Sequence, residues 1–173
     1  ETLGNLYDAD VTPGPDATTL VFRRLPTGVS VHRVTMADDG GITFDETPLW
    51  SFPTPGFGSV AAISRDAFYV AYRNGAGVWK VDHRYRDASN TVRTDTYDLP
   101  VNAFVSDLAV ANRVLFVLID NLLYHFLPVG GVLKEVGRTP LPPGSRFSYL
   151  PTETGGLFAL GGPGTATGIA RRE

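Results

Sequence analysis

Hydrophobic residues occur along this chain in short segments, either alternating with polar residues or as brief apolar runs bounded by Gly, Pro, Asn or Asp. A period of two and runs of this length are typical of β-strands joined by tight turns. No long segment has the 3.6-residue period of an amphipathic helix. The pattern predicts an all-β fold with strands at residues 6–12, 18–25, 29–36 and 42–50; 58–64, 67–73, 78–85 and 91–99; 104–111, 114–119, 122–128 and 132–141; and 147–150, 156–161 and 168–171.

These strands fall into groups of four that repeat every 42 to 48 residues, and the second strand of each group carries a similar apolar segment. A four-stranded repeat of this size is typical of β-propeller blades. We expect about three and a half blades in one partial propeller over residues 1–173, at 1–52, 53–100, 101–142 and an incomplete 143–173. A β-sandwich or jelly roll is the alternative, although neither has a reason to repeat every fourth strand.

A turn between the third and fourth predicted strands reads Ala37-Asp38-Asp39-Gly40-Gly41-Ile42-Thr43-Phe44. It resembles the Asp box of sialidase-type propellers, Ser-x-Asp-x-Gly-x-Thr-Trp/Phe, with Ala37 in place of Ser. The resemblance implies a structural turn in which Asp39 caps backbone N–H groups, Gly41 takes a positive φ, and the aromatic Phe44 after Thr43 packs between sheets. It implies no active site, because no motif assigns the sialidase arginines to residues of this chain.

Composition excludes several classes of partner and chemistry. The net charge of −3 and pI near 5.6 predict no affinity for nucleic acid or anionic membranes. Without cysteine, the chain has no disulfide framework and no Cys-based metal site. The apolar stretch 114–133 contains Asp120, Asn121 and His125, so it predicts two strands and no membrane span. Because the chain starts with Glu and has its single Met at position 36, we expect it to be a piece of a longer protein.

No recognisable catalytic or cofactor motif occurs. None of the three histidines, His32, His83 and His125, stands at metal-ligand spacing from another, so we expect no metal site. Asp8 and Asp10 alternate on one strand and therefore face the same side, where they could bind a cation, act in hydrolysis or simply line a solvated edge. An enzyme is disfavoured, and no cofactor is expected.

In a propeller, the loops from second to third strand and from blade to blade meet at one end, where ligands usually bind. The predicted ligand-binding face therefore consists of Arg24, Arg73, Asn74, Asp120, Asn121 and Arg146. Asn74 and Asn121 lie 47 residues apart. They indicate either one recognition contact per blade or a shared turn requirement, and we favour the turn.

Three and a half blades cannot close a ring, and open blade faces need a neighbour. The sequence therefore predicts a non-catalytic protein-interaction or assembly scaffold, completed by a protein partner, the remainder of the propeller or a second copy. One alternative is a carbohydrate-binding propeller, lectin-like or sialidase-related, with a glycan ligand. Another is a structural segment of a larger viral or surface protein. Nothing in the sequence assigns a compartment.

Overall fold

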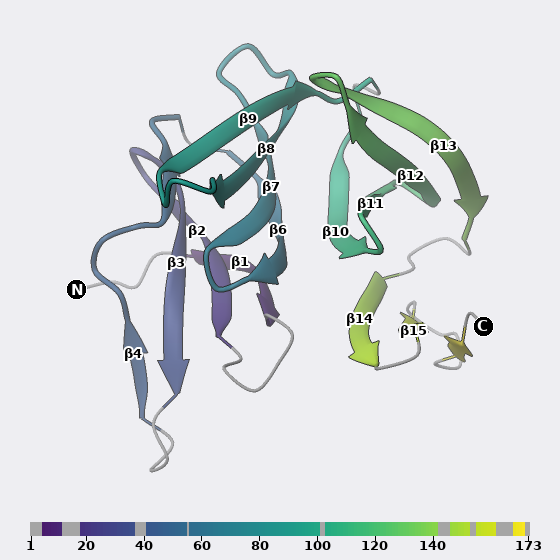
Figure 1. Cartoon of the computed structure of the whole chain (residues 1–173), viewed down its shortest axis with the longest axis horizontal. Helices are drawn as coiled ribbons and strands as arrows, with labels where there is room; N and C mark the ends of the chain where they lie inside the picture. The colour runs from purple at the N-terminus through teal and green to yellow at the C-terminus, as the bar shows by residue number, and fades with distance from the viewer. Residues whose placement is uncertain are drawn as a thin grey trace.

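The computed structural model of the chain consists of antiparallel β-sheets (Figure 1). It describes residues 5–11, 18–36, 41–54, 56–100, 103–141, 146–152, 155–161 and 168–171, with the backbone alone from residue 146 onward. The described residues contain no helix, which confirms the all-β prediction. Accordingly, none of them belongs to a helix long and apolar enough to cross a membrane.

The described strands form four antiparallel sheets. Sequence neighbours within a sheet pair as meanders, except that β4 and β5 both pair with β3. Sheet 1 contains β1 (Asn5–Val11), β2 (Thr19–Leu25), β3 (Gly28–Met36), β4 (Ile42–Phe44) and β5 (Trp50–Phe52). Sheet 2 contains β6 (Gly58–Ser64), β7 (Ala67–Arg73), β8 (Trp79–Arg86) and β9 (Val92–Asp98). Sheet 3 contains β10 (Val105–Ala111), β11 (Val114–Ile119), β12 (Leu122–Val129) and β13 (Val132–Pro140). Sheet 4 contains β14 (Arg146–Thr152), β15 (Gly155–Gly161) and β16 (Gly168–Arg171).

The predicted strand at residues 42–50 is wrong, because this segment forms two short strands that both pair with β3. Val34 pairs with Phe44 and Val31 pairs with Trp50, so the two residues of β3 between these pairs lie opposite five residues of the partner segment. Pro48 lies in that segment and has no N–H to donate to a ladder. The chain therefore loops away from β3 before it pairs again.

The four sheets follow one another around an arc, with their first strands on its inner side (Figure 1). Strand β1 lies against β6, β6 lies against β10, and β10 contacts β14. The outermost strands β4, β9 and β13 lie on the outside of the arc (Figure 1). Within the described residues the arc does not close into a ring.

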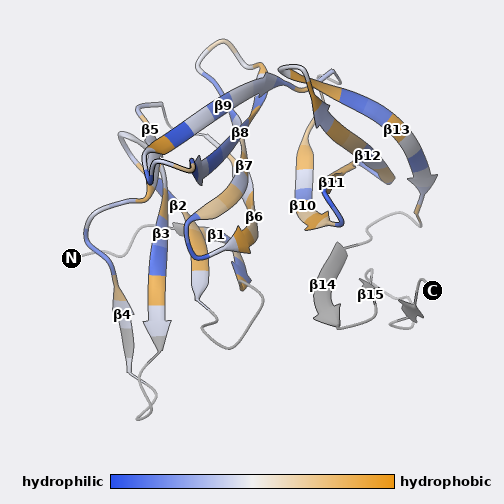
Figure 2. Ribbon diagram, viewed as in Figure 1, coloured by the Kyte–Doolittle hydropathy of each residue, from blue (hydrophilic) through white to orange (hydrophobic). Residues whose placement is uncertain are grey.

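Hydrophobic side chains fill the spaces between sheets 1 and 2 and between sheets 2 and 3. Along β7, Phe68, Val70 and Tyr72 belong to the core shared with sheet 1, whereas Tyr69 and Ala71 belong to the core shared with sheet 3. Because both sides of β7 are buried, the strand is a nearly continuous apolar run. The outer strands β9 and β13 are mostly exposed and hydrophilic (Figure 2). This gradient explains why second strands such as β7 carry a recognisable apolar segment in the sequence.

The segment resembling an Asp box follows β3 in the sequence and ends in β4, the fourth strand of sheet 1. Asp39 lies outside the described residues. Gly41 directly precedes β4, and Thr43 and Phe44 pair with Thr35 and Val34. The Phe44 side chain is half-buried, while Thr43 is exposed.

Candidate functional site

The residues of the predicted ligand-binding face lie at or near the loop that follows the second strand of sheets 1, 2 and 3, and at the start of sheet 4. Arg24 is the second-to-last residue of β2. Arg73 is the last residue of β7 and Asn74 follows it. Asp120 and Asn121 connect β11 to β12. Arg146 is the first residue of β14, and its side chain is outside the described part of the chain.

Asn74 and Asn121 have different local roles. The side-chain oxygen of Asn74 accepts hydrogen bonds from the backbone N–H of Ala76 (3.1 Å) and Val78 (2.9 Å), which closes the loop between β7 and β8. Arg73 is held in the same loop, because its Nε donates to the Gly77 carbonyl at 2.9 Å. Asn121 instead accepts a bond from the Leu141 N–H through its backbone carbonyl (2.8 Å). Arg73 and Asn74 are therefore held within the β7–β8 loop, whereas the Asn121 carbonyl bonds to the residue that follows β13.

Arg24 contacts a row of rings that crosses three sheets. Its guanidinium lies over the Phe57 ring, 5.0 Å from the centroid. Phe57 packs edge-on against Phe104 at 5.8 Å, and Phe104 packs edge-on against Trp79 at 5.6 Å. Phe57 and Phe104 are 38% and 50% exposed, so this row is partly open to solvent.

A hollow lies at the opposite end of the sheets, between sheets 2 and 3. Its volume is about 880 Å³. Sheet 2 contributes four ring side chains: Tyr69, His83, Tyr85 and Tyr97. Sheet 3 contributes the β10–β11 turn with Arg113 and the end of β12, and Asp10 reaches the hollow from sheet 1. We call this site the ring-lined cavity.

Three of the four rings form a column on sheet 2. Tyr69 and His83 are cross-strand partners and stack at 4.4 Å with an interplanar angle of 18°. His83 stacks in turn on Tyr85 at 4.8 Å and 25°. Such near-parallel rings do not form the box of perpendicular walls that encloses a cation. They form one wall of the cavity, which carries the hydroxyls of two tyrosines and the imidazole nitrogens.

Burial and nearby charge determine the protonation of these groups. Burial, together with Tyr97 and Asp95, raises the pKa of Tyr69 to about 12. A hydrogen bond to Asp95 raises the pKa of Tyr85, and burial with Asp95 raises that of Tyr97. Burial lowers the pKa of His83 despite the opposing effect of Asp95. At neutral pH the column therefore presents neutral phenols and a neutral imidazole.

Asp8 and Asp10 bond to the neighbouring sheet and do not line a solvated edge. Asp8 accepts hydrogen bonds from the Val60 N–H (2.8 Å) and the Ser59 hydroxyl (2.5 Å). Asp10 accepts one from the Ala62 N–H at 2.8 Å. Both acids thus satisfy backbone groups on the open edge of β6 and connect sheet 1 to sheet 2. Burial raises the pKa of both carboxyls, that of Asp10 to about 6.

Replacing Asp10 with asparagine should stabilise the protein at pH 7. Because the folded-state pKa of Asp10 lies above the unfolded value, the native state binds more protons between about pH 4 and pH 6, and stability falls as pH rises through that range. Asparagine keeps an oxygen for the Ala62 N–H and carries no charge. Because the Asp10 side chain is partly exposed, we expect Asp10→Asn to raise the free energy of unfolding by only roughly 1 kcal/mol at pH 7 and to change it little at pH 4.

Urea unfolding of both proteins at several pH values measures this effect. Asp120→Asn is the matched control, because Asp120 is exposed at a turn with φ 54°, a conformation that asparagine accepts. Equal pH dependence in wild type and Asp10→Asn would contradict the burial of this carboxyl against β6.

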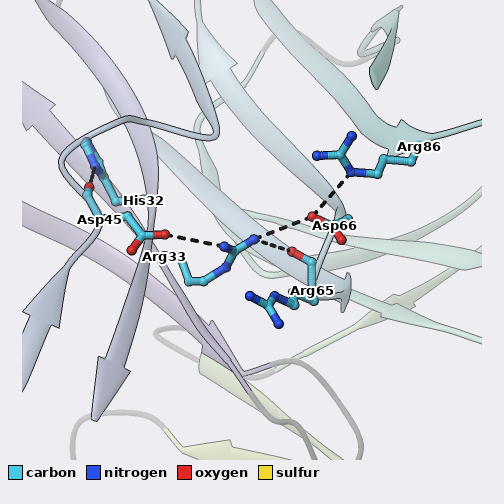
Figure 3. A network of polar contacts seen from close by, with 6 residues as sticks. All are labelled: His32, Arg33, Asp45, Arg65, Asp66 and Arg86. Atoms are coloured by element: carbon cyan, nitrogen blue, oxygen red, sulfur yellow. Dashed lines mark hydrogen bonds and ion pairs between the residues drawn. The ribbon is translucent and has the colours of Figure 1, made fainter. Parts of the chain in front are cut away.

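A second polar connection between sheets 1 and 2 is centred on Arg33 (Figure 3). Arg33 pairs with Asp45 at 3.4 Å and with Asp66 at 3.5 Å, and it donates to the Arg65 carbonyl at 3.3 Å. Asp66 also pairs with Arg86 at 3.6 Å. Since the acids of this network are substantially exposed, each pair contributes about 0–1 kcal/mol. The network orients the β6–β7 turn beside β3.

His32 joins this network from the side of sheet 1. One ring nitrogen, Nδ1, lies 2.8 Å from the Asp45 carbonyl, and the other lies 2.9 Å from the Ser30 hydroxyl. The buried imidazole is therefore held by hydrogen bonds within sheet 1. No group of three or more His, Asp or Glu residues among the described positions is arranged to hold a metal ion.

The chain matches no protein-family model, and no curated protein sequence matches it significantly.

Sequence reasoning missed the ring-lined cavity because it placed ligands at the other end of the sheets. A signal was present: the four rings Tyr69, His83, Tyr85 and Tyr97 lie on three successive predicted strands, and His83 and Tyr85 alternate on one of them. Alternation shows that side chains of one strand share a side. It does not show that β7, β8 and β9 bring these four rings together in one register.

Proposed function

We propose that this chain is a non-catalytic assembly scaffold, a partial β-propeller whose ring is completed by blades from a second copy. The observation that carries the proposal is the arc of consecutive meander sheets with β1, β6, β10 and β14 on its inner side. Propeller blades are four-stranded sheets arranged around a central channel in this order. An arc with open ends leaves sheet faces that another sheet can cover.

Contacts between successive sheets also support the proposal. Asp8 follows a bulge in β1 and pairs with Phe22, whose side chain faces sheet 2. Asp107 likewise follows a bulge in β10 and pairs with Leu118, whose side chain is on the side of sheet 3 away from sheet 2. An acid at this place in a first strand is suited to bind the next first strand, as Asp8 does with β6.

The side of sheet 1 that faces away from sheet 2 offers a surface for a further blade. Arg23 and Ser30 are cross-strand partners and alternate with Phe22 and Val31, which pack against sheet 2. On this outer side lies a hollow of about 380 Å³, to which Glu46 also contributes. Two copies of the chain would supply eight sheets, within the range of four to eight blades that propellers use.

The mass of the purified chain in solution, measured by light scattering and native mass spectrometry, tests this proposal. We expect a discrete dimer of the 18.6 kDa chain. Glu46→Lys, at the rim of the outer hollow of sheet 1, should shift the dimer toward monomer, whereas Asp120→Asn at an exposed turn should not. A folded, monodisperse monomer would contradict completion of the ring by a second copy.

Carbohydrate binding is the second candidate function. The specific observation in its favour is the ring-lined cavity, whose wall of phenols and imidazole offers several hydrogen-bonding groups in one place.

A further inference from the structure

The two walls of the ring-lined cavity differ in chemistry. Sheet 2 presents three phenols and an imidazole, groups that donate and accept hydrogen bonds; Tyr85 donates its hydrogen to Asp95 and offers its oxygen as an acceptor. Sheet 3 presents an aliphatic wall that includes Val110, Leu127 and Pro128. The volume of about 880 Å³ lies within the range of small-molecule sites. A matching ligand carries polar groups on one side and C–H groups on the other.

The charges that line the cavity balance one another. Among the described lining residues, Asp10 is the acid and Arg113 is the ionised base. His83 contributes a neutral imidazole, because burial lowers its pKa. Since one negative and one positive group oppose each other, the cavity has no net charge to select an ion.

The turn that carries Arg113 has a backbone suited to glycine. Asn112 and Arg113 have φ values of 49° and 66°, the left-handed geometry of a two-residue hairpin turn. The β12–β13 turn of the same sheet uses Gly130 and Gly131 for the same geometry, at 60° and 80°. An arginine there is strained, because its Cβ crowds the backbone. Strained residues cluster at binding and active sites, and this one lies at the cavity rim.

From these observations, we propose that the ring-lined cavity binds an uncharged carbohydrate. The sugar hydroxyls bond to the phenols, to His83 and to the guanidinium of Arg113, while the C–H side of the sugar ring packs on the aliphatic wall. All lining residues belong to sheets 1 to 3 of one chain. The site is therefore independent of ring completion, and the two proposals fail separately.

Titration of the ¹⁵N-labelled chain with sugars, followed by NMR, tests the assignment. The probes are glucose, galactose, mannose and N-acetylglucosamine with their disaccharides, at millimolar concentrations. We expect saturable shifts at the amides of Tyr69, His83 and Arg113 for at least one sugar. Arg113→Gly should weaken that binding about tenfold, the effect of losing hydrogen bonds from a charged donor. The same change should leave the melting temperature unchanged or raise it, because glycine relieves the turn.

Two further variants distinguish a ligand contact from a structural effect. Tyr85→Phe removes one hydroxyl and keeps the ring stack, so it should also weaken binding. Phe104→Ala changes an exposed ring at the opposite end of the sheets and should leave binding unchanged. The assignment is overturned if no sugar gives saturable shifts, if Arg113→Gly and Tyr85→Phe both bind as wild type does, or if only sialyllactose or tetramethylammonium binds.

Discussion

Replacing Phe22 with alanine should lower the free energy of unfolding by about 4 kcal/mol, the range observed when a buried phenylalanine is truncated in a packed core. Phe22 is fully buried in the core between sheets 1 and 2. The tip of its ring lies 2.4 Å from the position that a Cβ would occupy at Gly58, so the ring packs directly on the backbone of β6. No side chain of Gly58 is available to fill the space that the ring leaves.

Urea unfolding of Phe22→Ala and Phe104→Ala measures this loss against a matched control. Phe104 is half-exposed, so its truncation removes less buried surface and should cost about 1 kcal/mol or less. If both variants lost the same stability, sheets 1 and 2 would not share the core that contains Phe22.

Asp82→Ala should lower the free energy of unfolding by about 3 kcal/mol, because it leaves the buried indole N–H of Trp50 without an acceptor. Asp82 is only 5% exposed. Its carboxylate accepts hydrogen bonds from the Trp50 indole N–H and from the Thr96 hydroxyl, both at 2.8 Å. Trp50 belongs to sheet 1, whereas Asp82 and Thr96 belong to sheet 2. The carboxylate thus connects two sheets inside their shared core.

A double-mutant cycle separates this connection from a general effect of the substitution. Trp50→Phe removes the indole donor, so Asp82→Ala should cost less in that background, by about 1–2 kcal/mol. Asp82→Asn keeps one acceptor oxygen and should therefore lower the free energy of unfolding less than Asp82→Ala does. Additive costs of Trp50→Phe and Asp82→Ala would mean that the two side chains do not interact.

The strands could be predicted because their signal is local. In β6, β7 and β11 the apolar run and its turn residues stand side by side in the sequence, and the predicted ranges are those of the structure. The segment 42–50 could not be predicted in the same way. Its alternation is compatible with one strand, and the loop around Pro48 depends on which residues of β3 remain available for pairing.

The contacts of the candidate site residues could be predicted less well from the sequence than the strands could. Alternation predicted that Asp8 and Asp10 share a side, but not that this side meets the free N–H groups of β6. Loop position suggested Asn74 as a ligand residue or a turn residue, and its side chain bonds within its own loop. The outcome for Asp8 and Asp10 depends on partners 52 residues away, which periodicity does not specify, whereas Asn74 bonds to near neighbours in its own loop.

By itself, the sequence determined the all-β class and most of the strands, because side-chain period and turn chemistry act between near neighbours. Only the tertiary structure decided which sheet sides meet, where Asp8, Asp10 and Asp82 find their donors, and that Tyr69, His83, Tyr85 and Tyr97 line one cavity opposite Arg113. The physical reason is that packing between sheets joins residues far apart in the chain. The register and twist that bring them together are properties of the whole arrangement of sheets.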